Sequence, residues 1–108
     1  MNKGLRDQIN RYLPEKVEII RQKAHERAEK DFKTFCECIE KGEFFAVEED
    51  QICVTAHNGI LIQKKIWNDT YVKEISELFS NEDLEVIQVS SGNWALCDET
   101  SVYLKILK

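Results

Sequence analysis

Apolar residues in the first third of the chain recur at steps of three and four residues. The stripe consists of Leu5, Ile9, Leu13, Val17, Ile20, Ala24, Ala28, Phe32, Phe35, Cys36 and Ile39. This spacing is typical of one face of an α-helix. The opposite face carries Glu and Lys four residues apart, as at Glu26 and Lys30, which supports a helix further. The pattern therefore predicts a long amphipathic N-terminal helix.

Pro14 lies inside this pattern. Proline lacks a backbone donor and clashes with the preceding helical turn, but it fits well in the first turn of a helix. We therefore expect a short helix over residues 3–12 and a long one over residues 14–41, with a single kinked helix as the alternative. Gly42 follows directly and suits a C-terminal cap.

Beyond Gly42 the pattern becomes that of strands separated by turn residues. We expect strands at residues 43–47, 51–57, 60–67, 84–89, 94–97 and 102–107. Asn58-Gly59 is a strong hairpin signal between the second and third strands. Between the third and fourth strands a second helix is expected, with an apolar stripe of Tyr71, Val72, Ile75, Leu78 and Phe79.

These elements define an α+β protein in the order α(α)-βββ-α-βββ. A long N-terminal helix, broken or kinked near Pro14, and a second, shorter helix pack on a mainly antiparallel sheet of five to six strands, since the connections are short. A chain of 108 residues suits a single domain, 1–108. Its helical part would be 1–42, and its strand-rich part with one helix would be 43–108.

Composition and charge indicate which kinds of partner the chain can bind. The chain is 43% hydrophobic with one Pro and four Gly, as in ordered globular proteins. Residues 1–43 hold ten Lys/Arg against nine Asp/Glu, whereas residues 44–108 hold five against eleven. This acidic second part would repel nucleic acid and suit a basic protein surface. Without a long apolar run or a signal core, we expect a cytoplasmic protein that has no membrane partner.

The four cysteines are better explained by packing than by chemistry. Cys36 and Cys38 are two helical positions apart, so their side chains point about 200° away from each other and cannot share a zinc ion. Cys53 and His57 share a strand face but stand about 13 Å apart, too far for a catalytic dyad. His25 is expected to pack its ring edge and keep one nitrogen in solvent. No catalytic residue, metal ligand or cofactor is assigned.

The long helix exceeds the sheet that it should cover. A helix over residues 14–41 is about 42 Å long, whereas five strands side by side span about 24 Å. Its apolar stripe should therefore overhang the sheet and be covered by the first helix, by a second copy of the chain or by another protein. The expected partner-binding residues are Leu5, Ile9, Leu13, Val17, Ile20, Ala24 and Ala28.

The sequence thus favours a non-enzymatic protein-binding module. A small acidic phage or mobile-element inhibitor, acting on a host enzyme through protein–protein contact, is one instance of this class. A first alternative is a small enzyme or ligand-binding domain with a pocket between sheet and helix, lined by Cys53, His57, Trp94 and Cys97.

A second alternative is a nucleic-acid-binding protein. It would use the basic flank of the long helix, formed by Lys16, Lys23, Arg27 and Lys30. Because Glu15, Glu26 and Asp31 border this flank, a solvated face of ion pairs explains it better.

Overall fold

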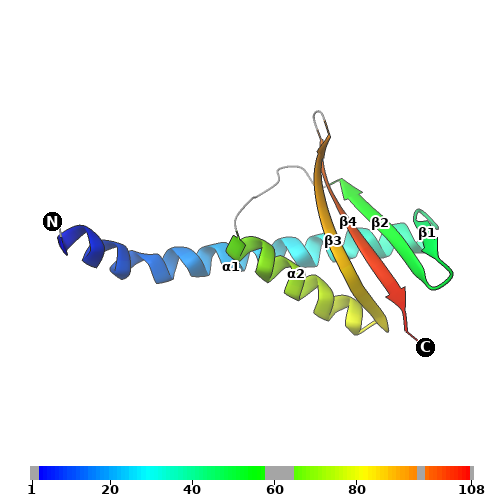
Figure 1. Cartoon of the computed structure of the whole chain (residues 1–108), viewed down its shortest axis with the longest axis horizontal. Coiled ribbons are helices and arrows are strands. Elements are labelled where there is room, and N and C mark those ends of the chain that lie inside the picture. Colours follow the sequence, from blue (N-terminus) through cyan, green and yellow to red (C-terminus); the bar gives the residue numbers. More distant parts are fainter. Residues whose placement is uncertain (1–2, 58–64, 95–96, 108) are drawn as a thin grey trace.

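The computed structural model describes residues 3–57, 65–94 and 97–107, without the side chains at 3, 93, 94, 97 and 98. Its elements are α1 (Lys3–Glu40), β1 (Phe45–Glu48), β2 (Gln51–His57), α2 (Lys65–Ser80), β3 (Leu84–Trp94) and β4 (Cys97–Ile106). The strands form one sheet in the order β1-β2-β4-β3, with every neighbouring pair antiparallel. Figure 1 shows the two helices packed beside this sheet, so the α+β class is confirmed.

α1 is one continuous helix of 38 residues that contains Pro14 in its interior. The prediction of a break at Pro14 into two helices is therefore wrong, and the single-helix alternative holds. The missing amide of Pro14 leaves the carbonyl of Asn10 without its intrahelical donor. Asn10 and Pro14 are both exposed, so water can bond to that carbonyl. No separate first helix folds back over the rest of α1.

The C-terminus of α1 is capped as Gly42 predicts. Gly42 has a φ of 74°, which glycine adopts without a steric penalty. Its amide donates to the carbonyl of Ile39 at 3.1 Å, and the amide of Glu43 donates to the carbonyl of Cys38 at 2.8 Å. These two bonds form a Schellman motif, which reverses the chain into β1.

The described residues form four strands, so the expected five to six are not confirmed. Residues that separate the expected strands are themselves extended: residues 90–93 lie within β3, and residues 98–100 lie within β4. These polar residues are extended because they pair across the hairpin, with Ser91 opposite Thr100 and Gly92 opposite Glu99. The segment 94–97 was expected to be a separate strand, but Trp94 ends β3, Cys97 begins β4 and the two residues pair with each other. Residues 95 and 96 lie outside the described residues.

The expected strand at residues 60–67 is also wrong in its last three residues, because α2 begins at Lys65. Residues 58–64, including the predicted Asn58-Gly59 turn, lie outside the described residues. The earlier start of α2 places Trp67 on its buried face with Tyr71, Ile75 and Phe79 at four-residue intervals. The buried residues of α2 therefore lie on one helical face, and the predicted stripe had included Tyr71, Ile75 and Phe79 of that face.

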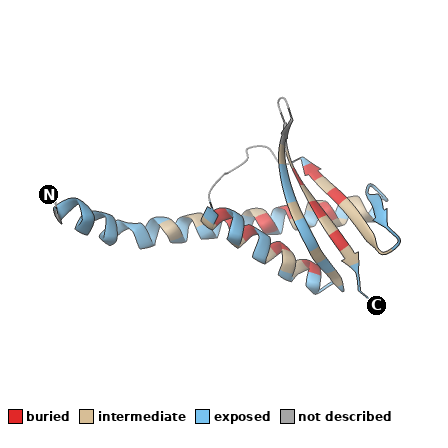
Figure 2. Cartoon of the chain, in the orientation of Figure 1, coloured by how far each residue is buried: buried red, intermediate tan, exposed pale blue. Residues whose placement is uncertain are grey.

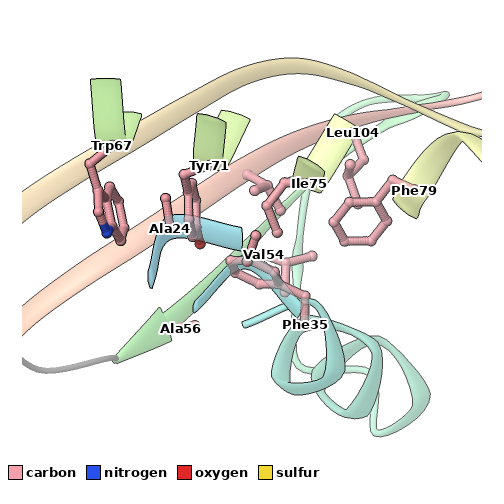
Figure 3. Close-up of a cluster of buried hydrophobic side chains, with 11 residues drawn as sticks. Ala24, Phe35, Val54, Ala56, Trp67, Tyr71, Ile75, Phe79 and Leu104 are labelled. Atoms are coloured by element: carbon pink, nitrogen blue, oxygen red, sulfur yellow. The ribbon is translucent and has the colours of Figure 1, made fainter. Parts of the chain in front are cut away.

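The core lies between the helices and one face of the sheet (Figure 3). Its buried side chains are Ala24, Ala28, Phe35, Val54, Ala56, Trp67, Tyr71, Ile75, Phe79, Val102 and Leu104. Phe79 packs edge-on against Phe32 at 4.8 Å between ring centroids, and Trp67 stacks on Tyr71 at 4.9 Å. Both helices and the two central strands, β2 and β4, contribute side chains to this core. The second half of α1 is therefore anchored by the core, whereas most of its first half lies outside it.

Candidate protein-docking surface

The N-terminal half of α1 projects from the rest of the molecule (Figure 2). Every residue from 4 to 16 is exposed, and the first buried residue of the helix is Ala24. The projection gives the molecule a longest dimension of 60 Å, against 34 and 20 Å along the other axes. α1 therefore extends beyond the sheet, as expected of a long helix, but most of the projection is the segment 4–12 that was expected to belong to a separate helix.

Apolar side chains line one face of this projecting helix. Leu5, Ile9, Tyr12 and Leu13 are 58%, 59%, 51% and 49% exposed. With Gln8 and Lys16 they border a shallow depression of about 270 Å³. We call these six residues the N-terminal patch. Tyr12 was not among the partner-binding residues expected from the sequence, although its position seven residues after Leu5 places it on the same helical face.

The seven predicted partner-binding residues fall into three groups. Leu5, Ile9 and Leu13 lie on the N-terminal patch. Val17 and Ile20 are partly buried, and Ile20 packs against the core. Ala24 and Ala28 are fully buried beneath the protein's own α2 and sheet, so no partner can reach them in this structure. The accessible surface is therefore confined to the first half of the helix.

The projecting segment is electrically balanced. Between Gly4 and Ile20 the basic residues are Arg6, Arg11 and Lys16, and the acidic residues are Asp7, Glu15 and Glu18. The guanidinium of Arg11 lies 5.7 Å from the centre of the Tyr12 ring, within range of a cation–π contact. The net charge of −5 thus belongs to the remainder of the chain.

Two of the four residues predicted to line a pocket between sheet and helix border one surface groove. Cys53 and His57 of β2 line this groove of about 580 Å³ together with Thr34 and Cys38 of α1. His57 is exposed, and its Nδ1 lies 3.5 Å from a carboxylate oxygen of Glu99. The side chains of Trp94 and Cys97 lie outside the described residues, so their part in a pocket stays a prediction.

The surroundings of Cys36 and Cys38 do not activate either thiol as a nucleophile. Partial burial raises the pKa of the Cys36 thiol, and the carboxylates of Glu82, Glu40 and Glu37 raise it further. A raised pKa disfavours the thiolate, which is the nucleophilic form. Cys38 packs against the core.

Among the described residues, one group has the chemistry and spacing of metal ligands: His25, Glu29 and Glu74, whose nearest ligand atoms lie within 4.8 Å of one another. Nε2 of His25 is 2.9 Å from Glu29 and its Nδ1 is 3.1 Å from Glu74. Both ring nitrogens of His25 thus have a carboxylate partner, while the side chain remains 48% exposed. The contact between His25 and Glu74 links α1 to α2.

The basic flank is only partly available to a polyanion. Nε of Arg27 bonds to Oδ1 of Asp31 at 3.3 Å, and Arg27 is only 21% exposed. Lys16, Lys23 and Lys30 are exposed. Asp31 was expected on the solvated face, but it is 2% exposed and lies within the core.

Comparison with known proteins gives no match: no protein-family model, no curated protein and no solved structure matches this chain. Of the helices that the structure describes, neither combines the length and the apolar character that a membrane crossing requires. The function must therefore be argued from the geometry of the chain itself.

Proposed function

We propose that this chain is a non-enzymatic protein-binding module and that the N-terminal patch on α1 is its docking surface. The observation that carries the proposal is a row of half-exposed apolar side chains on a helix that projects beyond its own core. Contiguous exposed apolar surface of this kind marks interaction sites in proteins.

The stability of the projecting segment supports the same function. Residues 4–20 extend α1 by about 25 Å with little packing against the core, and helical segments without such packing are marginal in water. Pro14 weakens this one further by removing a hydrogen bond. Docking of the apolar face would supply the packing that the segment lacks, since most helical stability in proteins comes from such packing.

The partner in this proposal is another protein or a second copy of the chain, and the location is the cytoplasm. A phage or mobile-element inhibitor of a host enzyme is one instance of the proposed class. In that case the acidic second part of the chain would face a basic surface of its target. Identifying the protein that docks on the patch would distinguish an inhibitor of a host enzyme from other kinds of protein-binding module.

The test compares two single variants at neighbouring positions. Ile9→Glu places a charge in the centre of the patch, whereas Asn10→Glu places the same charge about 100° around the helix, at an exposed position outside the patch. Immobilised wild-type chain and Asn10→Glu should retain the same stoichiometric protein partner from native extract, and Ile9→Glu should lose it. Equal retention by all three chains would refute the proposal.

A further inference from the structure

We infer that the N-terminal patch pairs with the same patch of a second copy, the two α1 helices running antiparallel. The inference rests on the proposed function, because it names the protein that docks there. It follows from the placement of charge along α1 and from the size of the exposed segment.

The row of side chains that begins on the N-terminal patch changes from apolar to basic along the helix. Leu5, Ile9 and Tyr12 occupy its first positions, and Lys16, Lys23 and Lys30 continue it at helical spacing. A parallel pair in register would place each lysine against its own copy. An antiparallel pair centred near Tyr12 brings only the patches together and leaves Lys23 and Lys30 beyond the contact.

The two halves of the projecting segment have opposite charge. Residues 4–12 carry Arg6 and Arg11 against Asp7, a net of +1, whereas residues 13–20 carry Glu15 and Glu18 against Lys16, a net of −1. In an antiparallel pair, the positive half of each helix lies against the negative half of the other. In a parallel pair, halves of the same charge lie against each other. Complementary fields of this kind select orientation more than they add affinity.

The acidic remainder of the chain also favours this arrangement. Because the projecting segment is neutral, the charge of −5 belongs to the remainder of each copy. Antiparallel overlap over residues 4–20 holds the two remainders apart by about 25 Å of helix, well beyond the screening length of about 8 Å at physiological salt. A parallel pair would hold them side by side.

The size of the contact sets its strength. A helical segment about 25 Å long and 10 Å wide offers less than the roughly 800 Å² per partner of a standard stable interface. The pair should therefore form and dissociate with concentration. An anionic membrane is a poorer occupant, because the segment has no net positive charge to attract it.

Sedimentation velocity and small-angle X-ray scattering on the purified full chain test the inference together. Sedimentation should reveal a monomer–dimer equilibrium that shifts with protein concentration. The monomer is 60 Å long, and an antiparallel dimer overlapping by about 25 Å should reach about 95 Å. Ile9→Glu should weaken dimerisation at least about tenfold, whereas Asn10→Glu should leave it unchanged.

Several results would overturn the inference: a monomer at every concentration, a dimer that Ile9→Glu does not weaken, or a dimer no longer than the monomer. Binding of the monomer to phosphatidylserine vesicles through the patch would overturn it too. If the chain is monomeric but Ile9→Glu abolishes retention of a foreign protein, self-pairing fails and the proposed function stands. If the chain is monomeric and all three chains retain the foreign protein equally, both self-pairing and the proposed function are refuted.

Discussion

The hydroxyl of Tyr71 donates a hydrogen bond of 2.6 Å to Oδ2 of Asp31, joining α2 to α1 inside the core. The other carboxylate oxygen of Asp31 accepts from Nε of Arg27 at 3.3 Å. The buried Thr100 side chain of β4 interacts with Tyr71 and links the network to the sheet. Buried polar groups with this many partners fix one arrangement of the elements around them. The network thus anchors the second half of α1 and thereby sets the direction in which the first half projects.

Removing the Tyr71 hydroxyl should destabilise the fold. Tyr71→Phe leaves the buried Asp31 carboxylate without one partner, which should lower the free energy of unfolding by about 1–3 kcal/mol in urea titrations. Tyr12→Phe removes the same hydroxyl from an exposed ring on the projecting helix and should change nothing measurable. Equal effects of the two variants would show that the Asp31–Tyr71 bond does not stabilise the fold.

The same bond predicts a loss of stability at alkaline pH. Burial, followed by the hydrogen bond and charge of Asp31, raises the pKa of Tyr71 above its usual value. The folded chain therefore keeps the phenolic proton where the unfolded chain releases it, so stability that is present below about pH 10 is lost as the pH rises further. Urea titrations from pH 8 to 11 should show an additional slope, at most about 1.4 kcal/mol per pH unit, in wild type relative to Tyr71→Phe. Parallel pH profiles of the two chains would contradict this.

Local pattern was enough to predict the stripe on α1, its Gly42 cap and its overhang, because these follow from helical periodicity and length. It was not enough at Asp31. That residue lies three positions after Ala28 and four before Phe35, which is core spacing, but its charge favoured the solvent. Besides Arg27 one turn earlier, the hydroxyl of Tyr71, 40 residues away in the sequence, satisfies this buried carboxylate, and a local window of sequence does not show that contact.

The strands were mispredicted where pairing overrides turn chemistry. Ser90 and Ser91 resemble a turn locally, but they lie opposite Ser101 and Thr100 in a long hairpin. Turn residues adopt the extended conformation when a partner strand supplies their hydrogen bonds, and the partner is not visible in a local window. For the candidate site, Ala24 and Ala28 belonged to the correct stripe, but the sequence could not tell which part of it the protein's own core covers.

Replacing Pro14 should strengthen the projecting helix alone. Pro14→Ala restores an amide donor in the middle of α1 and should stabilise the local helix by about 3 kcal/mol. Amide hydrogen exchange should slow in residues 10–18, and the circular dichroism signal of helix should increase. Core amides should be unaffected, because this segment lies outside the core. Faster exchange in residues 10–18 would show that Pro14 stabilises the helix and does not weaken it.

A charge on the buried part of the stripe should have a different consequence from one on the patch. Ala28 is fully buried, so Ala28→Glu places an unpaired carboxylate in the core and should lower the free energy of unfolding by more than about 4 kcal/mol or prevent folding. Ile9→Glu, at 59% exposure, should leave thermal unfolding of the core unchanged. An equally destabilised Ile9→Glu would mean that the projecting segment packs on the protein after all.

Hydrogen–deuterium exchange of the full chain can show whether the projecting half of α1 is the docking surface. Exchange should be followed in dilute protein, in concentrated protein and in complex with any protein that the wild-type chain retains. Amides of residues 4–20 should exchange fast in dilute protein and gain more protection than any other segment in at least one bound state. If bound states instead protect only residues of the sheet or of α2, or protect none, the N-terminal patch is not where this protein docks.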